Sequence, residues 1–320
     1  MAVIPVIPAG EVLDGHAGAA VMEGATGSGF LTLSGVDDAL GLAELRQEML
    51  AFFSAGEDAR AKTLRNKYDP ARPNVYRGHF PVDLAGDAML EGFDIGPDIA
   101  DPSRAGDGSD PLTEPTPRPG LPGWDQAVTA YYGALERLGL ALTRTVFAGL
   151  GADPDLADRW FTGGISTLRL LHYPEHPAEH FNAERCITVQ DGVTRYLMTG
   201  AHTDSGFVTL LWQDGTGGLQ AQGPDGDWID VPPAEGGLVV NFGQMLGDWS
   251  GGRIKATQHR VLGGTAERFS VPFFYEPAVD ARITPLSGDD EGFIYGDFVW
   301  ERMLRFPNMR GLVRKPAKSA

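Results

Sequence analysis

Downstream of residue 165 the chain is a succession of short apolar segments separated by turns, and this rhythm constrains the fold more than any other feature. The segments 187–190 and 193–198 are separated by Asp191-Gly192, a pair that favours a two-residue hairpin turn. Further strands are expected near residues 207–211, 218–222, 228–231, 237–241, 259–262 and 268–275. Many short strands at this spacing are typical of a double-sheet jelly roll.

The first half of the chain is richer in helical patterns. We expect strands at 3–7 and 29–33, helices at 11–23 and 37–55, a loop-rich stretch from 66 to 122, and one long amphipathic helix at 124–150. The expected fold class is mainly β with flanking helices (α+β), a distorted double-stranded β-helix with an N-terminal helical region. The N-terminal region 1–122 and the β-helix domain 123–320 are expected to form one compact unit.

Composition excludes several classes of protein. A chain of 320 residues with 42% hydrophobic content can bury a large core. Its net charge of −17 argues against nucleic acid as a partner, and no apolar run approaches the roughly 20 residues that span a bilayer. The single cysteine, Cys186, and a start without an export signal favour a soluble, cytoplasmic protein. The oligomeric state is left open.

His202, Asp204 and His259 are candidate metal ligands. Residues i and i+2 of an extended chain point to the same face, so His202 and Asp204 can reach one ion while Thr203 faces away. Two imidazoles and one carboxylate are the ligand set of a mononuclear non-haem iron(II) centre with open coordination positions. From these residues alone, a surface histidine beside a turn aspartate and a hydrogen-bonded core His259 are competing interpretations.

Arg268 and Ser270 are candidate carboxylate-binding residues. Strand alternation places them on one face of the segment 267–275, with Phe269 and Val271 on the other. An arginine that faces inward from an apolar strand is costly to bury unless an anion meets it, and its planar fork fits a carboxylate. Taken alone, the triplet is equally consistent with an arginine that faces solvent.

Four long motifs resemble the iron(II)/2-oxoglutarate-dependent dioxygenases of the isopenicillin N synthase-like superfamily. They are AHTDSGFVTLLWQDGTGGLQAQ, WIDVPP, GGLVVNFGQMLGDWSGGRIKATQHRV and ERFSVPFFYEP. The resemblance covers about residues 3–310, with 101–122 and 175–195 the poorest matches. It implies that His202, Asp204 and His259 bind Fe(II).

The same resemblance implies the cosubstrate site. Arg268 and Ser270 match the pair that binds the distal carboxylate of 2-oxoglutarate, and Tyr173 matches a tyrosine that positions this cosubstrate. Leu171 and His172 stand where many members have Asn and Tyr, which puts one cosubstrate hydrogen bond in doubt. Gln244 replaces a common Asp in the NFG-x-ML segment at residues 241–246.

The implied reaction is oxidation of a small-molecule substrate by dioxygen, by default hydroxylation, with release of succinate and carbon dioxide. Ascorbate is expected as a stimulant, and no catalytic acid or base beyond the metal centre is required. Desaturation or ring formation needs no different ligands. Two other functions stay open: an iron oxidase that uses no 2-oxoglutarate, as isopenicillin N synthase and aminocyclopropane carboxylate oxidase do, and a non-catalytic binding protein.

Substrate contacts are the least specific part of the prediction. Phe274, His180 and Arg185 are the candidate substrate residues, with ordinary core packing or loop surface as the competing interpretations. The segments 101–122 and 175–195 are expected to act as lids over the iron, because loops on a rigid scaffold usually carry specificity. The identity of the substrate is left open.

Overall fold

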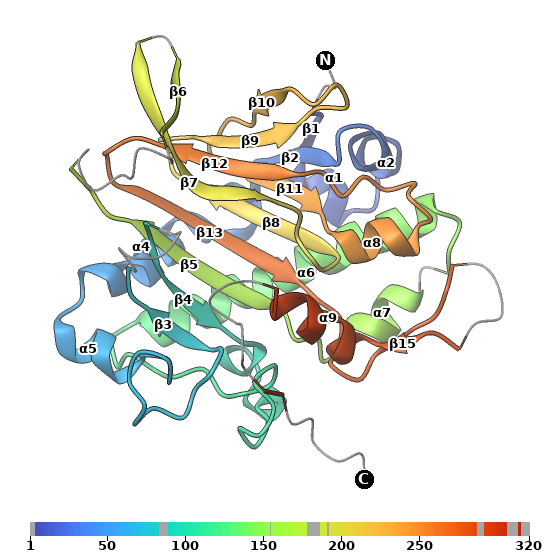
Figure 1. Ribbon diagram of the computed structural model, residues 1–320. Coiled ribbons are helices and arrows are strands. Elements are labelled where there is room, and N and C mark those ends of the chain that lie inside the picture. The colour runs from blue at the N-terminus through green and yellow to red at the C-terminus, as the bar shows by residue number, and fades with distance from the viewer. Residues whose placement is uncertain are drawn as a thin grey trace.

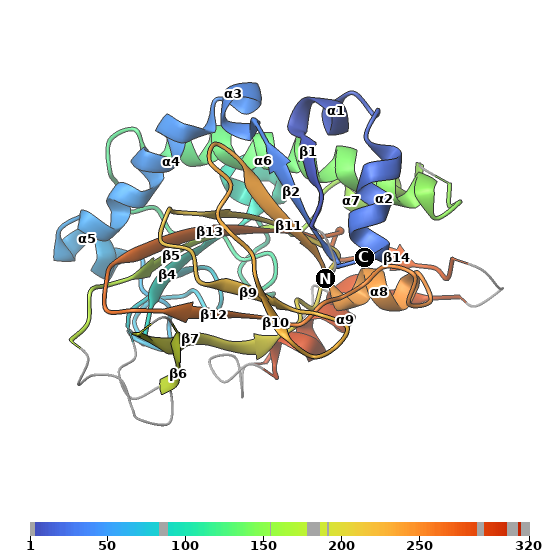
Figure 2. The ribbon, with the colours of Figure 1, turned by 90° about the horizontal axis from the view of Figure 1, so that it is seen from above.

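Two β-sheets face each other, and most of the helices lie behind the larger one (Figures 1 and 2). The structure is a computed structural model that describes residues 4–82, 89–153, 155–177, 186–190, 192–286, 291–305 and 313–314. The expected jelly roll with flanking helices is confirmed, because the chain alternates between the two sheets throughout its second half.

The larger sheet contains eight strands in the spatial order β1-β2-β11-β8-β13-β5-β4-β3. They are β1 (Val6–Pro8), β2 (Phe30–Ser34), β3 (Gly78–Phe80), β4 (Glu91–Ile95), β5 (Thr167–Tyr173), β8 (Val208–Gln213), β11 (Leu238–Phe242) and β13 (Arg268–Tyr275). All neighbouring pairs are antiparallel except β1 with β2.

The smaller sheet contains five antiparallel strands in the order β10-β9-β12-β7-β6. They are β6 (Cys186–Gln190), β7 (Val193–His202), β9 (Leu219–Gln222), β10 (Trp228–Asp230) and β12 (His259–Gly263). Gln190 pairs with Val193, which confirms the hairpin expected there. Tyr173, Met198 and Val261 belong to an apolar cluster that joins the two sheets.

The long helix expected at 124–150 is α6 (Trp124–Gly149), and it crosses behind the large sheet (Figure 2). Its buried face includes Val128, Leu135 and Leu142, which recur at the helical spacing of the sequence pattern. The other helices are α1 (Ala9–Leu13), α2 (Gly18–Thr26), α3 (Val36–Leu40), α4 (Leu42–Leu50), α5 (Glu57–Lys62), α7 (Asp155–Phe161), α8 (Gln244–Trp249) and α9 (Tyr295–Met303). Three 3₁₀ turns, η1 (Ala51–Ser54), η2 (Pro97–Ile99) and η3 (Pro102–Arg104), and a short ladder of β14 (Arg282–Ile283) with β15 (Phe293–Ile294) complete the described elements.

The structure corrects three sequence-based expectations in the first half. The helix expected at 11–23 is divided into α1 and α2, and the helix expected at 37–55 is divided at Gly41, whose φ of 66° is left-handed. The loop-rich stretch 66–122 also contains the short strands β3 and β4, which the sequence pattern did not predict. β4 is buried on both faces, so its five residues show no alternation that would mark a strand.

The N-terminal strands complete the large sheet. β2 pairs with β11, and β4 pairs with β5. The first third of the chain therefore supplies the strands at both edges of the large sheet, and the later strands form its centre. A domain division near residue 122 stays a prediction. None of the described helices combines the length and the apolar character needed to cross a membrane.

Candidate active site

The end of β7 and the start of β12 bring the predicted metal ligands together. His202 is the last residue of β7, His259 is the first of β12, and the two are direct partners across the antiparallel ladder. Their ring centroids are therefore 4.3 Å apart. Asp204 follows two residues after His202, as the i, i+2 argument requires.

The geometry of these three side chains suits one metal ion. Asp204 Oδ1 lies 3.7 Å from Nε2 of His202 and 3.7 Å from Nε2 of His259. Nδ1 of each histidine faces a backbone carbonyl, Gly200 O at 2.8 Å and Thr257 O at 3.3 Å. A proton on each Nδ1 leaves the Nε2 lone pairs free, which is how metal-binding histidines are usually oriented. Within the described parts of the chain, these residues form the one His, Cys, Asp or Glu group with such spacing.

Asp204 is held by its second oxygen. Oδ2 accepts hydrogen bonds from Thr209 Oγ1 at 2.5 Å and Asn241 Nδ2 at 2.7 Å, so Oδ1 is left for a metal. Burial by itself raises the pKa of Asp204, but His259, His202 and these two hydrogen bonds outweigh burial and hold the pKa below its ordinary value. Burial lowers the pKa of His259, which favours the neutral imidazole that a metal needs.

The sequence did not predict one backbone hydrogen bond that holds the loop with Asp204. The backbone N–H of Gln244, at the start of α8, donates to the carbonyl of Asp204 over 2.7 Å. The Gln244 side chain instead donates to Asp248 Oδ1 at 2.6 Å. The side chain at this position is therefore directed at its own helix, whereas the backbone N–H holds the loop that carries Asp204.

Arg268 lies between the two sheets without an acidic partner. It is 4% exposed, and within the described residues it forms no ion pair. Its guanidinium donates to Gly217 O at 3.0 Å, Ser270 Oγ at 3.2 Å and Gln213 Oε1 at 3.3 Å. A buried cation that meets only neutral oxygens favours the binding of an anion. The predicted inward orientation of Arg268 and Ser270 is confirmed.

Leu171 and His172, the two residues that depart from the family pattern, lie on opposite faces of β5. Tyr173 pairs with Arg268 across β5 and β13, and the guanidinium carbon lies 4.8 Å from the centre of its ring. Leu171, on the same face of the strand, packs in the apolar cluster between the sheets. His172 faces the other way, stacks on Phe269 with ring centroids 4.6 Å apart, and therefore does not contact the same side of the sheet as Tyr173.

His172 belongs to a separate ion-pair network. Its Nδ1 lies 2.8 Å from Glu91 Oε1, and its Nε2 lies 2.9 Å from Glu267 Oε1. Burial opposes the charged imidazole, but Glu91 and Glu267 outweigh it and raise the pKa of His172. Burial also opposes the charged form of Glu91, yet His172 and His79 lower the pKa of that carboxyl to about 2.

We expect His172→Phe to destabilise the fold in a pH-dependent manner. The raised pKa of His172 stabilises the folded state fully below the unfolded value of 6.5, and this contribution is lost as pH rises through the folded value. The Glu91 contribution is present above its unfolded value of 4.5 and is lost as pH falls toward about 2. The loss should therefore be largest between these two unfolded values, which urea unfolding at about pH 5.5 and about pH 8.5 measures. The exposed control His16→Phe should show no such difference, and an equal loss at both pH values would contradict the network.

A cavity of about 170 Å³ opens beside His202 and Asp204. Phe274 lines it, together with apolar Leu112 and Ile165. The sequence-predicted candidates His180 and Arg185 lie outside the described residues. Leu112 comes from the segment expected as a lid at 101–122, whereas the described part of 175–195 contributes no wall residue to this cavity. Closure of either segment over the iron stays a prediction.

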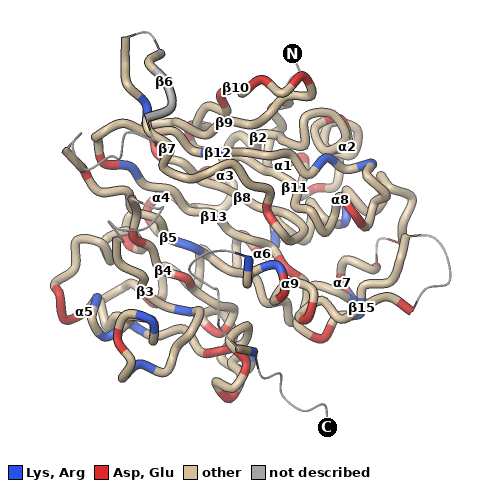
Figure 3. Tube along the Cα trace, viewed as in Figure 1, with Lys and Arg blue, Asp and Glu red and all other residues tan. Residues whose placement is uncertain are grey.

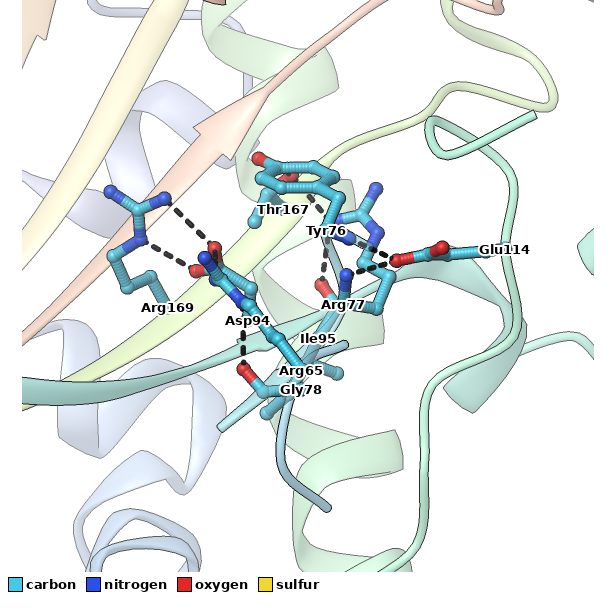
Figure 4. Close-up of polar contacts among 9 residues, drawn as sticks. All are labelled: Arg65, Tyr76, Arg77, Gly78, Asp94, Ile95, Glu114, Thr167 and Arg169. Atoms are coloured by element: carbon cyan, nitrogen blue, oxygen red, sulfur yellow. Dashed lines mark hydrogen bonds and ion pairs between the residues drawn. The ribbon is translucent and has the colours of Figure 1, made fainter. Parts of the chain in front are cut away.

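The segment 101–122 forms hydrogen bonds with the residues that directly precede β3. Glu114 accepts hydrogen bonds from the backbone N–H groups of Tyr76 at 2.5 Å and Arg77 (Figure 4). It also accepts one from the backbone N–H of Val75 at 2.9 Å. Asn74 donates to the carbonyl of Pro115 over 2.6 Å. These contacts hold residues 114 and 115 in place beside the cavity in this structure, and closure of the segment over the iron stays a prediction.

A buried arginine cluster forms the polar wall of the cavity and was not identified from the sequence. Charged positions of both signs gather around β3, β4 and β5 (Figure 3). Asp94 lies between Arg65 and Arg169, and Arg169 Nε is 2.5 Å from Asp94 Oδ1 (Figure 4). Burial favours the neutral form of Asp94, but Arg169, Arg65 and Arg77 outweigh it and lower the pKa.

Arg77 completes this cluster with neutral partners. Its Nη1 donates to Thr167 Oγ1 at 2.6 Å and to Ile95 O at 3.3 Å, and its Nη2 donates to Ile165 O at 3.1 Å. Arg77 and Arg169 both line the cavity. The available sequence signal was a charged residue inside an apolar strand, since Arg169 interrupts the leucines of β5.

Comparisons with known proteins agree with this geometry. A family model described as the 2OG-Fe(II) oxygenase superfamily matches residues 164–277, a segment that contains all six residues predicted to bind the metal or the cosubstrate. A 2-oxoglutarate-dependent dioxygenase of Didymella fabae is 37% identical over 53% of this chain, which spans about half (51%) of that relative. The 2-oxoglutarate-dependent dioxygenase citB of Monascus ruber is 34% identical over 73% of this chain and 70% of its own length.

A solved structure extends the comparison to nearly the whole chain. A full-length protein of Neurospora crassa, crystallised in complex with alpha-KG and 5-formyluracil, superposes with a TM-score of 0.74 at 26% identity and covers 93% of this chain and 95% of its own. This chain belongs to the 2OG-Fe(II) oxygenase superfamily. The cofactors of that family are Fe(II), 2-oxoglutarate and dioxygen, so the predicted family and cofactors are confirmed.

Proposed function

We propose that this protein is an Fe(II)- and 2-oxoglutarate-dependent dioxygenase that oxidises a small molecule, by default through hydroxylation, with release of succinate and carbon dioxide. The convergence of His202, Asp204 and His259, each with a free donor atom, carries the proposal. The relatives named as 2-oxoglutarate-dependent dioxygenases support this function over the iron oxidases that use no 2-oxoglutarate.

The protein's own groups bind and orient the reactants. His202 and His259 would bind iron through Nε2, and Asp204 through Oδ1, which leaves three coordination positions open. When bound, iron and 2-oxoglutarate supply the oxidising chemistry that removes hydrogen from a C–H bond. No side chain is required as an acid or a base.

Arg268 and Ser270 would bind the distal carboxylate of 2-oxoglutarate. Their neutral neighbours leave the positive charge of Arg268 available, and burial between the sheets excludes competing water. The aromatic ring of Tyr173 lies next to the guanidinium of Arg268 and helps to orient it. Phe274 and the other apolar wall residues would hold the substrate next to the metal ligands.

The substrate is proposed to be small and not a macromolecule. An apolar cavity of about 150 Å³ holds benzene, so a cavity of about 170 Å³ accommodates a single ring or a group of that size. The 5-formyluracil bound by the Neurospora protein is likewise a molecule with one ring. The net charge of −17 and the single cysteine support a cytoplasmic protein without nucleic acid or membrane partners.

Release of carbon dioxide from 2-oxoglutarate tests this function. We expect purified protein with Fe(II), ascorbate and 2-oxoglutarate labelled in its 1-carboxylate to release labelled carbon dioxide, and we expect the true substrate in a small-molecule panel to accelerate that release. Addition of an iron chelator, as a control, should abolish the release of labelled carbon dioxide. A protein that binds neither Fe(II) nor 2-oxoglutarate would refute the proposal.

A further inference from the structure

Glu276 carries a buried carboxyl that the proposed chemistry does not use. It follows β13 directly, is 9% exposed, and lines the same cavity as His202 and Asp204. Its Oε2 has no hydrogen-bond partner, and neither oxygen forms an ion pair with another described residue. Buried polar groups are nearly always hydrogen-bonded, so such a carboxyl needs an explanation.

The fold makes room for this carboxyl beside the metal-binding loop. A Cβ at Gly206 would overlap Glu276 Oε1, so any other residue there would displace the side chain. Gly206 is two residues beyond Asp204 and also lines the cavity. The backbone around Glu276 is fixed as well, because its N–H donates to Ser166 Oγ at 3.0 Å.

Most of the other polar groups of the cavity have protein partners. Arg169 forms two hydrogen bonds with Asp94, and the Tyr76 hydroxyl is 3.1 Å from Thr167 Oγ1. Arg77 donates to four protein oxygens through Nη1 and Nη2, whereas its Nε has no partner among the described residues. The rest of the wall is largely apolar, with Phe274, Val299 and Met303 among its residues. Glu276 therefore offers a ligand in this cavity a carboxyl that is not already paired with a described cation.

We propose that Glu276 determines substrate specificity by hydrogen-bonding a neutral group that both donates and accepts a hydrogen bond, such as the –CO–NH– unit of a one-ring lactam or imide. This inference rests on the proposed function and names the substrate class of the same site. A carboxyl without a paired cation is buried most cheaply in its neutral form. The neutral form has one O–H donor and one carbonyl acceptor, which match a cis-amide in two hydrogen bonds.

Burial agrees with this form of the side chain. Burial is the largest effect and raises the pKa of Glu276 well above its usual range, and Arg77 offsets only part of the rise. A charged substrate amine is not favoured here, because Arg77 and Arg169 form part of the same wall.

Matched probes test the assignment through binding, without turnover. Calorimetry under anaerobic conditions, with Fe(II) and 2-oxoglutarate present, would compare 2-pyridone with N-methyl-2-pyridone, whose donor is blocked. We expect the full-length protein to bind 2-pyridone on the order of tenfold more tightly. Glu276→Leu should lose this preference, whereas Glu276→Gln should keep it within a few-fold, because a carboxamide also donates and accepts. The exposed control Glu301→Gln on α9 should behave as the unchanged protein.

Several outcomes would overturn the assignment. They are failure of the unchanged protein to bind 2-pyridone, equal binding of the two probes, retention of the preference in Glu276→Leu, or tighter binding of benzylamine than of 2-pyridone. The Glu276→Gln variant guards against misfolding, since it alters neither shape nor volume. If 2-oxoglutarate fails to bind the unchanged protein, the proposed function fails. If 2-oxoglutarate binds but the two probes are not distinguished, the role of Glu276 alone fails.

Discussion

Replacing Arg268 with leucine should raise the apparent Michaelis constant for 2-oxoglutarate on the order of a hundredfold or more. A buried charge pair that loses one partner typically costs about 3–5 kcal/mol, and each 1.4 kcal/mol is about tenfold in affinity. Arg268 is buried between the sheets, and the described partners of its guanidinium are neutral oxygens, so its positive charge is available to a carboxylate. Initial rates of labelled carbon dioxide release at varied 2-oxoglutarate would measure the effect.

Three further variants test whether the effect comes from the guanidinium of Arg268. Ser270→Ala removes one hydrogen bond to a charged group, about 1.5–3 kcal/mol, so its effect should be smaller. Arg268→Lys keeps the charge but loses the planar fork, and should lie between the two. Arg282→Leu changes an exposed arginine on β14 and serves as the control for loss of positive charge. Unaltered 2-oxoglutarate affinity in a folded Arg268→Leu protein would assign this arginine to a different ligand.

Alanine at His202, Asp204 or His259 should abolish activity and weaken iron binding by more than about a hundredfold. Mutating residues that merely orient a metal's ligands already costs about 10–100-fold in affinity or activity, so loss of a ligand should cost more. The fold should survive, because His202 ends β7, Asp204 follows that strand, His259 begins β12, and none of the three belongs to the apolar clusters. Iron content after dialysis and circular dichroism would measure the two effects.

Neighbouring substitutions provide the comparison. Thr203→Ala lies between two of the ligands and should leave iron binding unchanged, whereas Asn241→Ala removes the hydrogen bond on Asp204 Oδ2 and should weaken binding about 10–100-fold. One equivalent of iron with full turnover in any of the three ligand variants would remove that residue from the site.

Local patterns sufficed for much of the second half of the chain. β8, β9, β10, β11, β12 and β13 each lie within about two residues of the predicted segments, because short apolar runs bounded by turns have few other stable conformations. α6 was predictable for a similar reason, since its apolar face recurs with helical spacing. The orientations of His202 with Asp204, and of Arg268 with Ser270, follow from strand alternation alone.

The errors lie where long-range contacts decide the conformation. Gly41 ends one helix and starts the next with a left-handed backbone, which apolar spacing does not reveal. β4 forms from a segment that contains Glu91 and Asp94, two acidic residues that a strand pattern disfavours. Both are stabilised by histidines and arginines far away in the sequence, so the strand is favourable only when its partners are in place.

The sequence by itself determined the strand rhythm of the jelly roll and, through its motifs, the candidate residues of the iron and 2-oxoglutarate sites, because these depend on spacing within short segments. Only the tertiary structure decided what surrounds the substrate. Leu112, Arg169 and Glu276 come from three distant segments, and each is an ordinary residue in its local context. They share one cavity because the loop before α6, β5 and the end of β13 lie together beside Asp204. The free-energy cost of burying Arg169 and Glu276 depends on the neighbours that this arrangement gives them, such as Asp94 for Arg169.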